Sequence, residues 1–107
     1  MIVVTTHQIE GKKIVRVLGL VRGNTVRARH VGRDIVAGMR HIIGGEISEY
    51  TKLIAESREQ AIDRMLAEAH ALGANAIVGV QFTTANIMMS SAELLAYGTA
   101  VVVEDAN

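Results

Sequence analysis

Cysteine and proline are absent from this chain of 107 residues, and aromatic side chains are scarce. Without cysteine, the chain can form neither a disulfide framework nor a thiolate metal site. The sequence offers no physical reason for the missing proline. The aromatic supply consists of Tyr50, Phe82 and Tyr97 alone. Because half of the residues are nevertheless hydrophobic, the core must be built from aliphatic side chains, with some left over for an interface.

Long hydrophobic runs are lacking too, since no apolar stretch reaches the roughly 18–20 residues that a membrane span needs. The chain starts with a short apolar stretch that precedes its first charges, which is the reverse of a signal peptide's order. We therefore expect a soluble, cytoplasmic protein that does not insert into a membrane. The length suits a single domain over residues 1–107.

Net charge is zero, but the charges are unevenly spread. Residues 11–41 carry a net charge of +7, residues 42–107 carry −6, and Glu10 balances the sum. A basic half can indicate nucleic-acid binding. No aromatic residue lies among these arginines, however, and stacking on bases requires one. We therefore expect the basic segment to meet the chain's own acidic half, and we expect no nucleic-acid partner.

Hydrophobic periodicity predicts the elements. Apolar, β-branched runs predict strands, and an i, i+4, i+7 spacing predicts helices. The expected strands are residues 2–6, 14–21, 25–31, 75–82 and 94–104, with a break at Gly23-Asn24 and a loop over 83–93. The expected helices are residues 33–43, which Gly44 and Gly45 end, and 48–72, with Ser48 as N-cap and Gly73 after the end.

Three glycines interrupt the predicted strands, namely Gly19, Gly79 and Gly98. Glycine weakens a strand interior, so each position needs a reason. Close approach of the long helix to the sheet is one explanation. Unrelated β-bulges are the other, and the sequence does not choose between them.

One candidate metal site consists of His41, Glu46 and Glu49, which could converge where the two predicted helices meet. A histidine with two carboxylates can bind Zn²⁺ or Mn²⁺. The three residues are spread over a glycine pair, not held at i, i+4 spacing. The favoured interpretation is therefore ordinary charge preference at helix ends, with Glu49 near an N-terminus and His41 near a C-terminus.

An anion site is also conceivable at "HVGRD", where a predicted helix opens. Its backbone amides could hold an anion with help from Arg33. No Ser-His-Asp or GxSxG pattern is present to suggest hydrolytic catalysis. We therefore predict no catalytic residues and leave the cofactor open, with a divalent metal as the candidate.

The chain resembles the YbjQ family of small uncharacterised bacterial and archaeal proteins. The resemblance is carried by "GRDIVAGMRHIIGGEISEYTKLIAESREQAIDRMLAEAHALGANAIVGV" and by "YGTAVVV". It implies an α+β fold with a two-layer β-α-β-β core like the dodecin subunit, in which an antiparallel sheet carries a long helix on one face. The last strand would lie between the two strands that flank the helix. Extra short strands would serve oligomer assembly.

The same resemblance implies a ring-shaped homopentamer, and members are often labelled "putative heavy-metal-binding". The missing cysteine speaks against soft metals here. We expect a non-enzymatic, pentameric module that binds a metal ion or a small anionic ligand between subunits. A purely structural or protein-binding oligomer and an enzyme with an inter-subunit site remain alternatives. The residues expected at the subunit contact are Val26, Arg27, Arg29 and Val31.

Overall fold

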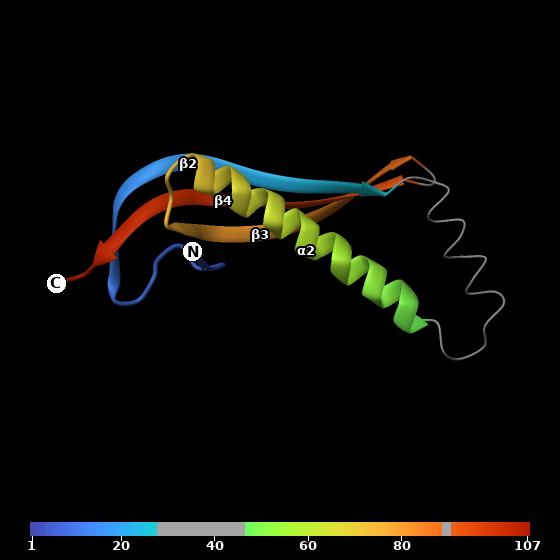
Figure 1. Cartoon of the computed structure of the whole chain (residues 1–107), viewed down its shortest axis with the longest axis horizontal. Coiled ribbons are helices and arrows are strands. Elements are labelled where there is room, and N and C mark those ends of the chain that lie inside the picture. The colour runs from blue at the N-terminus through green and yellow to red at the C-terminus, as the bar shows by residue number, and fades with distance from the viewer. Residues whose placement is uncertain (28–46, 89–90) are drawn as a thin grey trace.

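The computed structural model describes residues 1–27, 47–88 and 91–107, which form a four-stranded sheet with one long helix on one face (Figure 1). The sheet order is β1-β3-β4-β2, so the last strand lies between the two strands that flank the helix. This confirms the predicted α+β, two-layer fold. The elements are β1 (Ile2–Val3), β2 (Lys12–Arg27), α2 (Ile47–Ala71), β3 (Ala76–Met88) and β4 (Ser91–Asp105).

The sheet is mixed, whereas we expected it to be antiparallel throughout. β4 pairs antiparallel with both β2 and β3, but β1 runs parallel to β3. The N-terminal residues continue this parallel contact past β1, since the amide of Val4 donates to the carbonyl of Ile77 (3.0 Å) and that of Gly79 to the carbonyl of Thr6 (2.8 Å). β1 is therefore shorter than the predicted strand, although the contact itself extends to Thr6.

Three strands are longer than the sequence predicted. β2 continues through Gly23-Asn24 without a break, and β3 and β4 extend into the predicted loop until Met88 pairs with Ser91. Both corrections have the same cause. Each stretch pairs with β4, or with β3, along its whole length, and this pairing outweighs the local preference of Gly, Asn and Ser for turns.

Helix α2 agrees with its prediction to within one residue at each end. It begins at Ile47, so Ser48 lies inside the first turn and is not the N-cap that we expected. After its end, Gly73 has φ +85°, and the amide of Ala74 donates to the carbonyl of Ala69 (3.1 Å). Glycine accepts this left-handed conformation at little cost, which explains the stop. The helix predicted over 33–43 lies outside the described residues.

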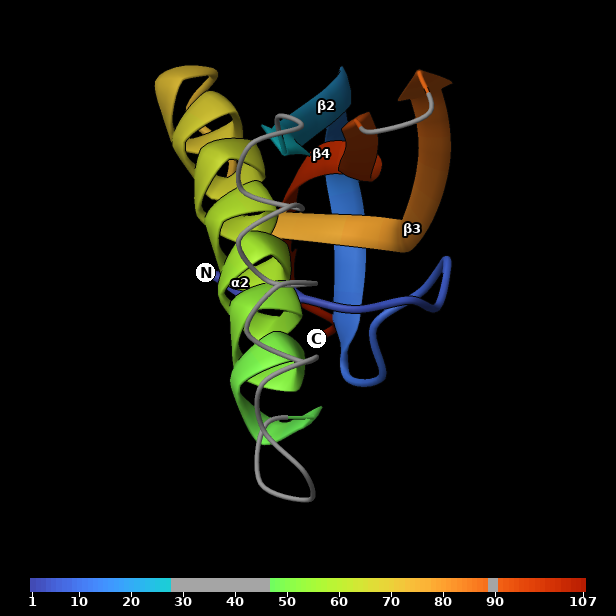
Figure 2. The ribbon, with the colours of Figure 1, turned by 90° about the vertical axis from the view of Figure 1, so that its right-hand side faces the viewer.

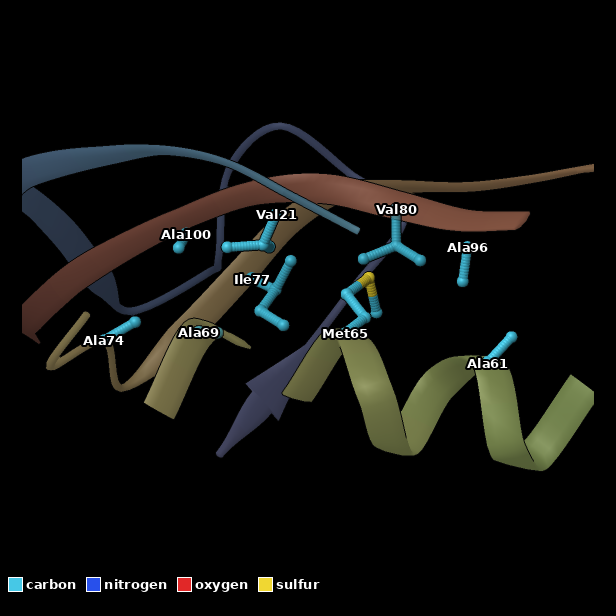
Figure 3. Packing of buried hydrophobic residues seen from close by; sticks show 9 residues of the cluster. All are labelled: Val21, Ala61, Met65, Ala69, Ala74, Ile77, Val80, Ala96 and Ala100. Carbon is cyan, nitrogen blue, oxygen red and sulfur yellow. The ribbon is translucent and has the colours of Figure 1, made fainter. Parts of the chain in front are cut away.

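The core lies between α2 and the sheet (Figure 3). Met65 and Ala61 of the helix meet Val21, Ile77 and Val80 of the strands. No aromatic side chain is buried in the part of the chain that the structure describes, as the composition predicted. Alanines make up much of this cluster: Ala61, Ala69, Ala74, Ala96 and Ala100.

A smaller cluster covers part of the opposite face of the sheet. Ile2, Val4 and Ile9 of the N-terminal segment pack there. They lie against alternate residues of β3 and β4, namely Ala76, Val78, Val101 and Val103. The N-terminal segment therefore protects one end of the face that α2 leaves open.

The interior glycines have separate explanations. Gly19 and Gly79 have positive φ angles (+123° and +62°) and lie at breaks in strand register, so both are bulge positions. At Gly98 a Cβ would lie 2.8 Å from Ile77 Cγ2, so close packing within the sheet explains it. The close approach of the long helix occurs instead at Gly23, where a Cβ would meet the backbone of Ala61 and Met65. We had predicted a strand break there.

The helix crosses the sheet obliquely, and its N-terminal half diverges from the strands (Figures 1 and 2). Ile54, in that half, is accordingly exposed, as is Phe82 on β3. No helix in the described ranges is long and apolar enough to cross a membrane.

Candidate functional site

Most of the residues predicted to hold a ligand lie where the structure gives no description. His41 and Glu46 of the metal group and Arg33 of the anion site fall within 28–46. Glu49 lies in the first turn of α2. Among residues 1–27, 47–88 and 91–107, no three histidine or acidic side chains gather closely enough to hold a metal ion. The predicted metal and anion sites remain predictions.

The predicted subunit contact is partly described. Arg29 and Val31 fall outside the described residues, and Arg27 is the last residue of β2. Val26, the residue before it, is a large apolar side chain that is 52% exposed near the end of this edge strand. Its exposure draws attention to the surface on which it lies.

That surface is the outer face of the sheet, which we define as the face opposite α2. Strand register identifies its members, because residues directly opposite each other in a pair point to the same side. Val21, whose side chain is buried against α2, lies opposite Gly98, so the residues that alternate with these two point outward. Away from the N-terminal segment, the outer face comprises Leu20, Arg22, Asn24 and Val26 of β2, Glu93, Leu95, Tyr97 and Thr99 of β4, and Gln81, Thr83 and Ala85 of β3.

The outer face mixes exposed apolar side chains with a few polar links. Leu20 is 62% exposed, and Val17, which lies opposite Val101 further along β2, is 67% exposed. The hydroxyl of Tyr97 donates to Gln81 Oε1 (3.0 Å), and the amide Nδ2 of Asn24 donates to Glu93 Oε2 (3.1 Å). These links tie the three strands together across the surface.

The free edge of β2 is the second feature of this region. β2 pairs with β4 on one side, and its other side has no strand neighbour among the described residues. Arg64 of α2 reaches this strand and donates from Nη1 to the carbonyl of Asn24. No sequence pattern predicts this contact, because the acceptor is a backbone group on a segment 40 positions away.

The free edge of β3 is the third feature. The N-terminal segment covers β3 only as far as Val80, whose amide donates to the carbonyl of Val4 (3.1 Å). From Gln81 to Met88, β3 pairs with β4 alone within the described structure. Among the described residues, β2 along its length and β3 beyond Val80 are therefore each paired on one side only.

Positive charge is concentrated on β2, which carries no acidic residue and holds Lys12, Lys13, Arg16, Arg22 and Arg27. β3 carries no charged residue at all. At the far end of β2, Lys12 Nζ lies 2.6 Å from Asp105 Oδ1 of β4. The hydrogen bond and positive charge of Lys12 lower the pKa of Asp105 below its usual value.

Comparison with known proteins supplies the family. A family model described as "Putative heavy-metal-binding", named for YbjQ, matches residues 1–104. Similar proteins carry the name UPF0145. One from Clostridioides difficile is 52% identical over 107 residues, covering 100% of this chain and 96% of its own. Another from Pyrococcus horikoshii is 57% identical over 104 residues, covering 97% and 89% respectively.

A solved structure agrees with the fold. The crystal structure of a protein of unknown function of the DUF74 family, from Pediococcus pentosaceus, superposes with a TM-score of 0.64 at 14% identity. It covers 97% of this chain and 98% of its own. At this identity the likeness concerns the fold alone. The match of the family model along almost the whole chain, together with relatives above 50% identity, shows that the protein belongs to the YbjQ (UPF0145) family.

Proposed function

We propose that the protein is a non-enzymatic module that works as a homo-oligomer, assembled as a closed, dodecin-like pentameric ring. In this proposal it binds a divalent metal ion or a small anionic ligand between subunits. The observation that carries the self-assembly is that β2, and β3 from Gln81 onward, have a strand partner on one side only among the described residues. Natural proteins avoid leaving such edges open, because unpaired backbone groups recruit other strands.

Two further observations support self-assembly. The described core is thin, since its largest fully buried side chains are only Met65, Ile77, Val21 and Val101. Large apolar side chains are meanwhile exposed on β2, including Val17, Leu20 and Val26. A small domain gains limited stability from one core, and contiguous exposed apolar surface marks interaction sites. Burying this surface between copies would supply the missing apolar contacts.

The ligand part of the proposal rests on the description of the family and on His41, Glu46 and Glu49. These residue types bind hard or borderline divalent metals without cysteine. A purely structural or protein-binding oligomer is the competing proposal, and the mixed apolar and polar outer face favours it. The two proposals differ in whether a small ligand accompanies the assembled protein.

Native mass spectrometry of protein made without added metal tests both parts together. We expect a mass of five copies of the 11.5 kDa chain. A retained small mass would support ligand binding, and its absence would favour the structural alternative. A folded monomer would contradict the self-assembly.

Zinc titration into chelator-treated protein then tests the predicted metal group. We expect binding weaker than micromolar, because the three residues lack helical i, i+4 spacing and thiolates. A one-to-one site tighter than that, lost in His41→Ala, would contradict the expectation of weak binding. The matched control is His70→Ala, which changes an exposed histidine in the last turn of α2.

A further inference from the structure

The backbone of β2 shows which of its residues present hydrogen-bonding groups at the free edge. In a strand, the N–H and C=O of successive residues point alternately to the two sides. The carbonyl of Ile77 accepts from the amide of Val4, so the backbone N–H and C=O of Ile77 face the N-terminal segment. Those of the next residue, Val78, face β4. Val78 lies opposite Thr99. The backbone N–H and C=O of Thr99 therefore face β3 and not β2.

The same alternation continues from β4 into β2. Since the backbone groups of Thr99 face β3, those of Gly98 face β2. The backbone groups of Val21, which pairs with Gly98, accordingly face β4. Leu20, Arg22, Asn24 and Val26 must then direct their N–H and C=O groups out of the sheet. The contact from Arg64 to the carbonyl of Asn24 is consistent with this, because Arg64 belongs to α2 and not to β4.

The free edge of β3 follows from the register past its bulge. By alternation from Thr99, the backbone N–H and C=O of Tyr97 also face β3, where its partner is Gln81. The backbone of Gln81 thus points to β4, and that of Phe82 and Thr84 points outward. Among the described residues, neither Phe82 nor Thr84 makes a backbone hydrogen bond to a turn, loop or terminal segment. β3 therefore also offers an open edge, over residues 82–86.

Charge decides which edges can meet. Pairing β2 with β2 of a second copy would bring together two strands that each carry five cations and no acid. Like charges on adjacent strands destabilise the pair. β3 has no charge, so a second copy's β3 accepts β2 without this repulsion. The complementary pairing joins two different edges, as a head-to-tail contact requires.

Strand direction fits the same arrangement. β2 and β3 both run antiparallel to β4, so they point the same way within one chain. Copies placed side by side in one orientation would then bring β2 of one against β3 of the next as parallel neighbours. Repeating this contact makes a sheet that continues from chain to chain and can close into a ring.

We propose that β2 of one copy, through residues 20–26, adds in parallel to the free edge of β3, residues 82–86, of a second copy. This inference rests on the proposed self-assembly and specifies its contact. It places the interface on described strands, with Val26 inside it, whereas the sequence had pointed to residues 26–31.

Engineered cysteines test the contact cleanly, because the chain has none of its own. Neighbouring strands lie about 4.8 Å apart, within the Cα separation that a disulfide spans. Thr83→Cys lies on the outer face of β3. It is combined in separate variants with Leu20→Cys, Arg22→Cys or Val26→Cys, so that three different offsets between the two strands are sampled. On mild oxidation we expect at least one double variant to form a ladder from dimers upward.

The matched control replaces Thr83→Cys by Phe82→Cys, which is exposed but lies on the face that α2 covers. In a continuous sheet, the β2 cysteines on the outer face lie on the opposite side from a cysteine at position 82. These double variants should therefore not cross-link. Dimers from the single β2 cysteines alone would indicate β2–β2 pairing and overturn the inference.

Sedimentation separates failure of the contact from failure of the assembly. An oligomer in which no double variant cross-links would overturn the β2–β3 contact and leave self-assembly standing. A folded monomer would remove both.

Hydrogen exchange on the unmodified chain gives an independent check. The amides of Arg22, Val26, Phe82 and Thr84 should exchange about tenfold or more slowly than that of Glu10, in an exposed turn. Equally fast exchange in the oligomer would also refute the contact.

Discussion

Gly23 shows how one missing side chain positions an entire helix. The backbone of α2 passes so near this residue that a Cβ would meet the carbonyl of Ala61, the amide of Met65 and the Cβ of Arg64. Most of these are backbone atoms, which cannot rotate away as the end of a side chain can. The glycine is therefore needed for close packing between helix and strand, and not for a turn.

We expect Gly23→Ala to lower the free energy of unfolding by roughly 1–3 kcal/mol or more, because relieving the overlap requires moving the helix. Gly98→Ala should have a smaller effect, since two of the three atoms that it meets belong to methyl groups, of Ile77 and Val80. Urea unfolding of both variants measures this order. A loss below about 0.5 kcal/mol in Gly23→Ala would mean that the helix is free to shift.

The ion pair between Lys12 and Asp105 carries the second prediction at this scale. Lys12 lowers the pKa of Asp105 through a hydrogen bond and its charge. A lowered folded-state pKa stabilises the protein above the unfolded pKa, and that contribution is lost as pH falls through the folded value. The carboxyl is exposed, so the effect on stability should be small.

Lys12→Met should raise the pKa of Asp105 toward its ordinary value. Lys13→Met is the control, since the neighbouring lysine has no ion pair with Asp105 among the described contacts. Carbon-detected NMR titration of the Asp105 carboxyl distinguishes the two. An unchanged midpoint in Lys12→Met would show that the pair does not persist in solution.

At the scale of elements, Asn75 fixes the start of β3 against the end of β4. Its side-chain amide donates to the carbonyl of Val103 (2.9 Å), and its Oδ1 accepts from the amide of the same residue (2.8 Å). One side chain therefore serves both backbone groups of a buried β4 residue, as a neighbouring strand would.

Asn75→Ala should cost about 1–3 kcal/mol, because two hydrogen bonds of about 0.5–1.5 kcal/mol each are lost. Gln81→Ala removes one exposed hydrogen bond, to Tyr97, and should change stability by less than about 0.5 kcal/mol. Thermal unfolding compares the two. Equal losses of stability in the two variants would show that the hydrogen bonds from Asn75 to Val103 contribute no more than one exposed hydrogen bond.

Helix α2 contributes to the core mainly through Met65, its largest fully buried side chain. Met65→Ala should cost about 2–5 kcal/mol, through lost burial and the cavity that remains. Leu72→Ala, at an exposed position just after the helix, should stay within about 0.5 kcal/mol. Calorimetry measures both. A small loss in Met65→Ala would indicate that neighbouring residues collapse into the space.

At the scale of the whole molecule, the question is what holds copies together. Exposed ion pairs contribute only about 0–1 kcal/mol each and weaken in salt. Apolar burial and strand pairing are not screened in this way, and the exposed Val17, Leu20 and Val26 supply the apolar surface. Charge on β2 would instead decide which edges meet.

We therefore expect the oligomer to persist at micromolar concentration in strong salt. Sedimentation velocity at low and high salt measures this directly. A folded monomer near 11.5 kDa at high salt alone would show that ion pairs hold the assembly. A monomer at both salt concentrations would remove the assembly itself.

Local sequence determined the elements that depend on near neighbours along the chain. The periodicity of residues 48–72 and the glycine at 73 predicted α2 to within one residue. The closing strand, apolar on both faces, was correctly placed between its neighbours through the family resemblance. The aromatic-poor composition predicted an aliphatic core. The metal group stays a prediction, since His41 and Glu46 lie outside the described residues.

Only the tertiary structure decided what depends on partners far away in the chain. Gly23-Asn24 resembled a strand break, yet pairing with β4 and contact with α2 make it the middle of β2. Residues 83–88 resembled a loop, yet register with β4 extends β3 through them. The unpaired edge of β2 follows from the strand order, and that of β3 beyond Val80 follows from the short contact with the N-terminal segment; both depend on segments far apart in the chain. Helical periodicity is a local property, whereas strand pairing joins residues that no local pattern connects.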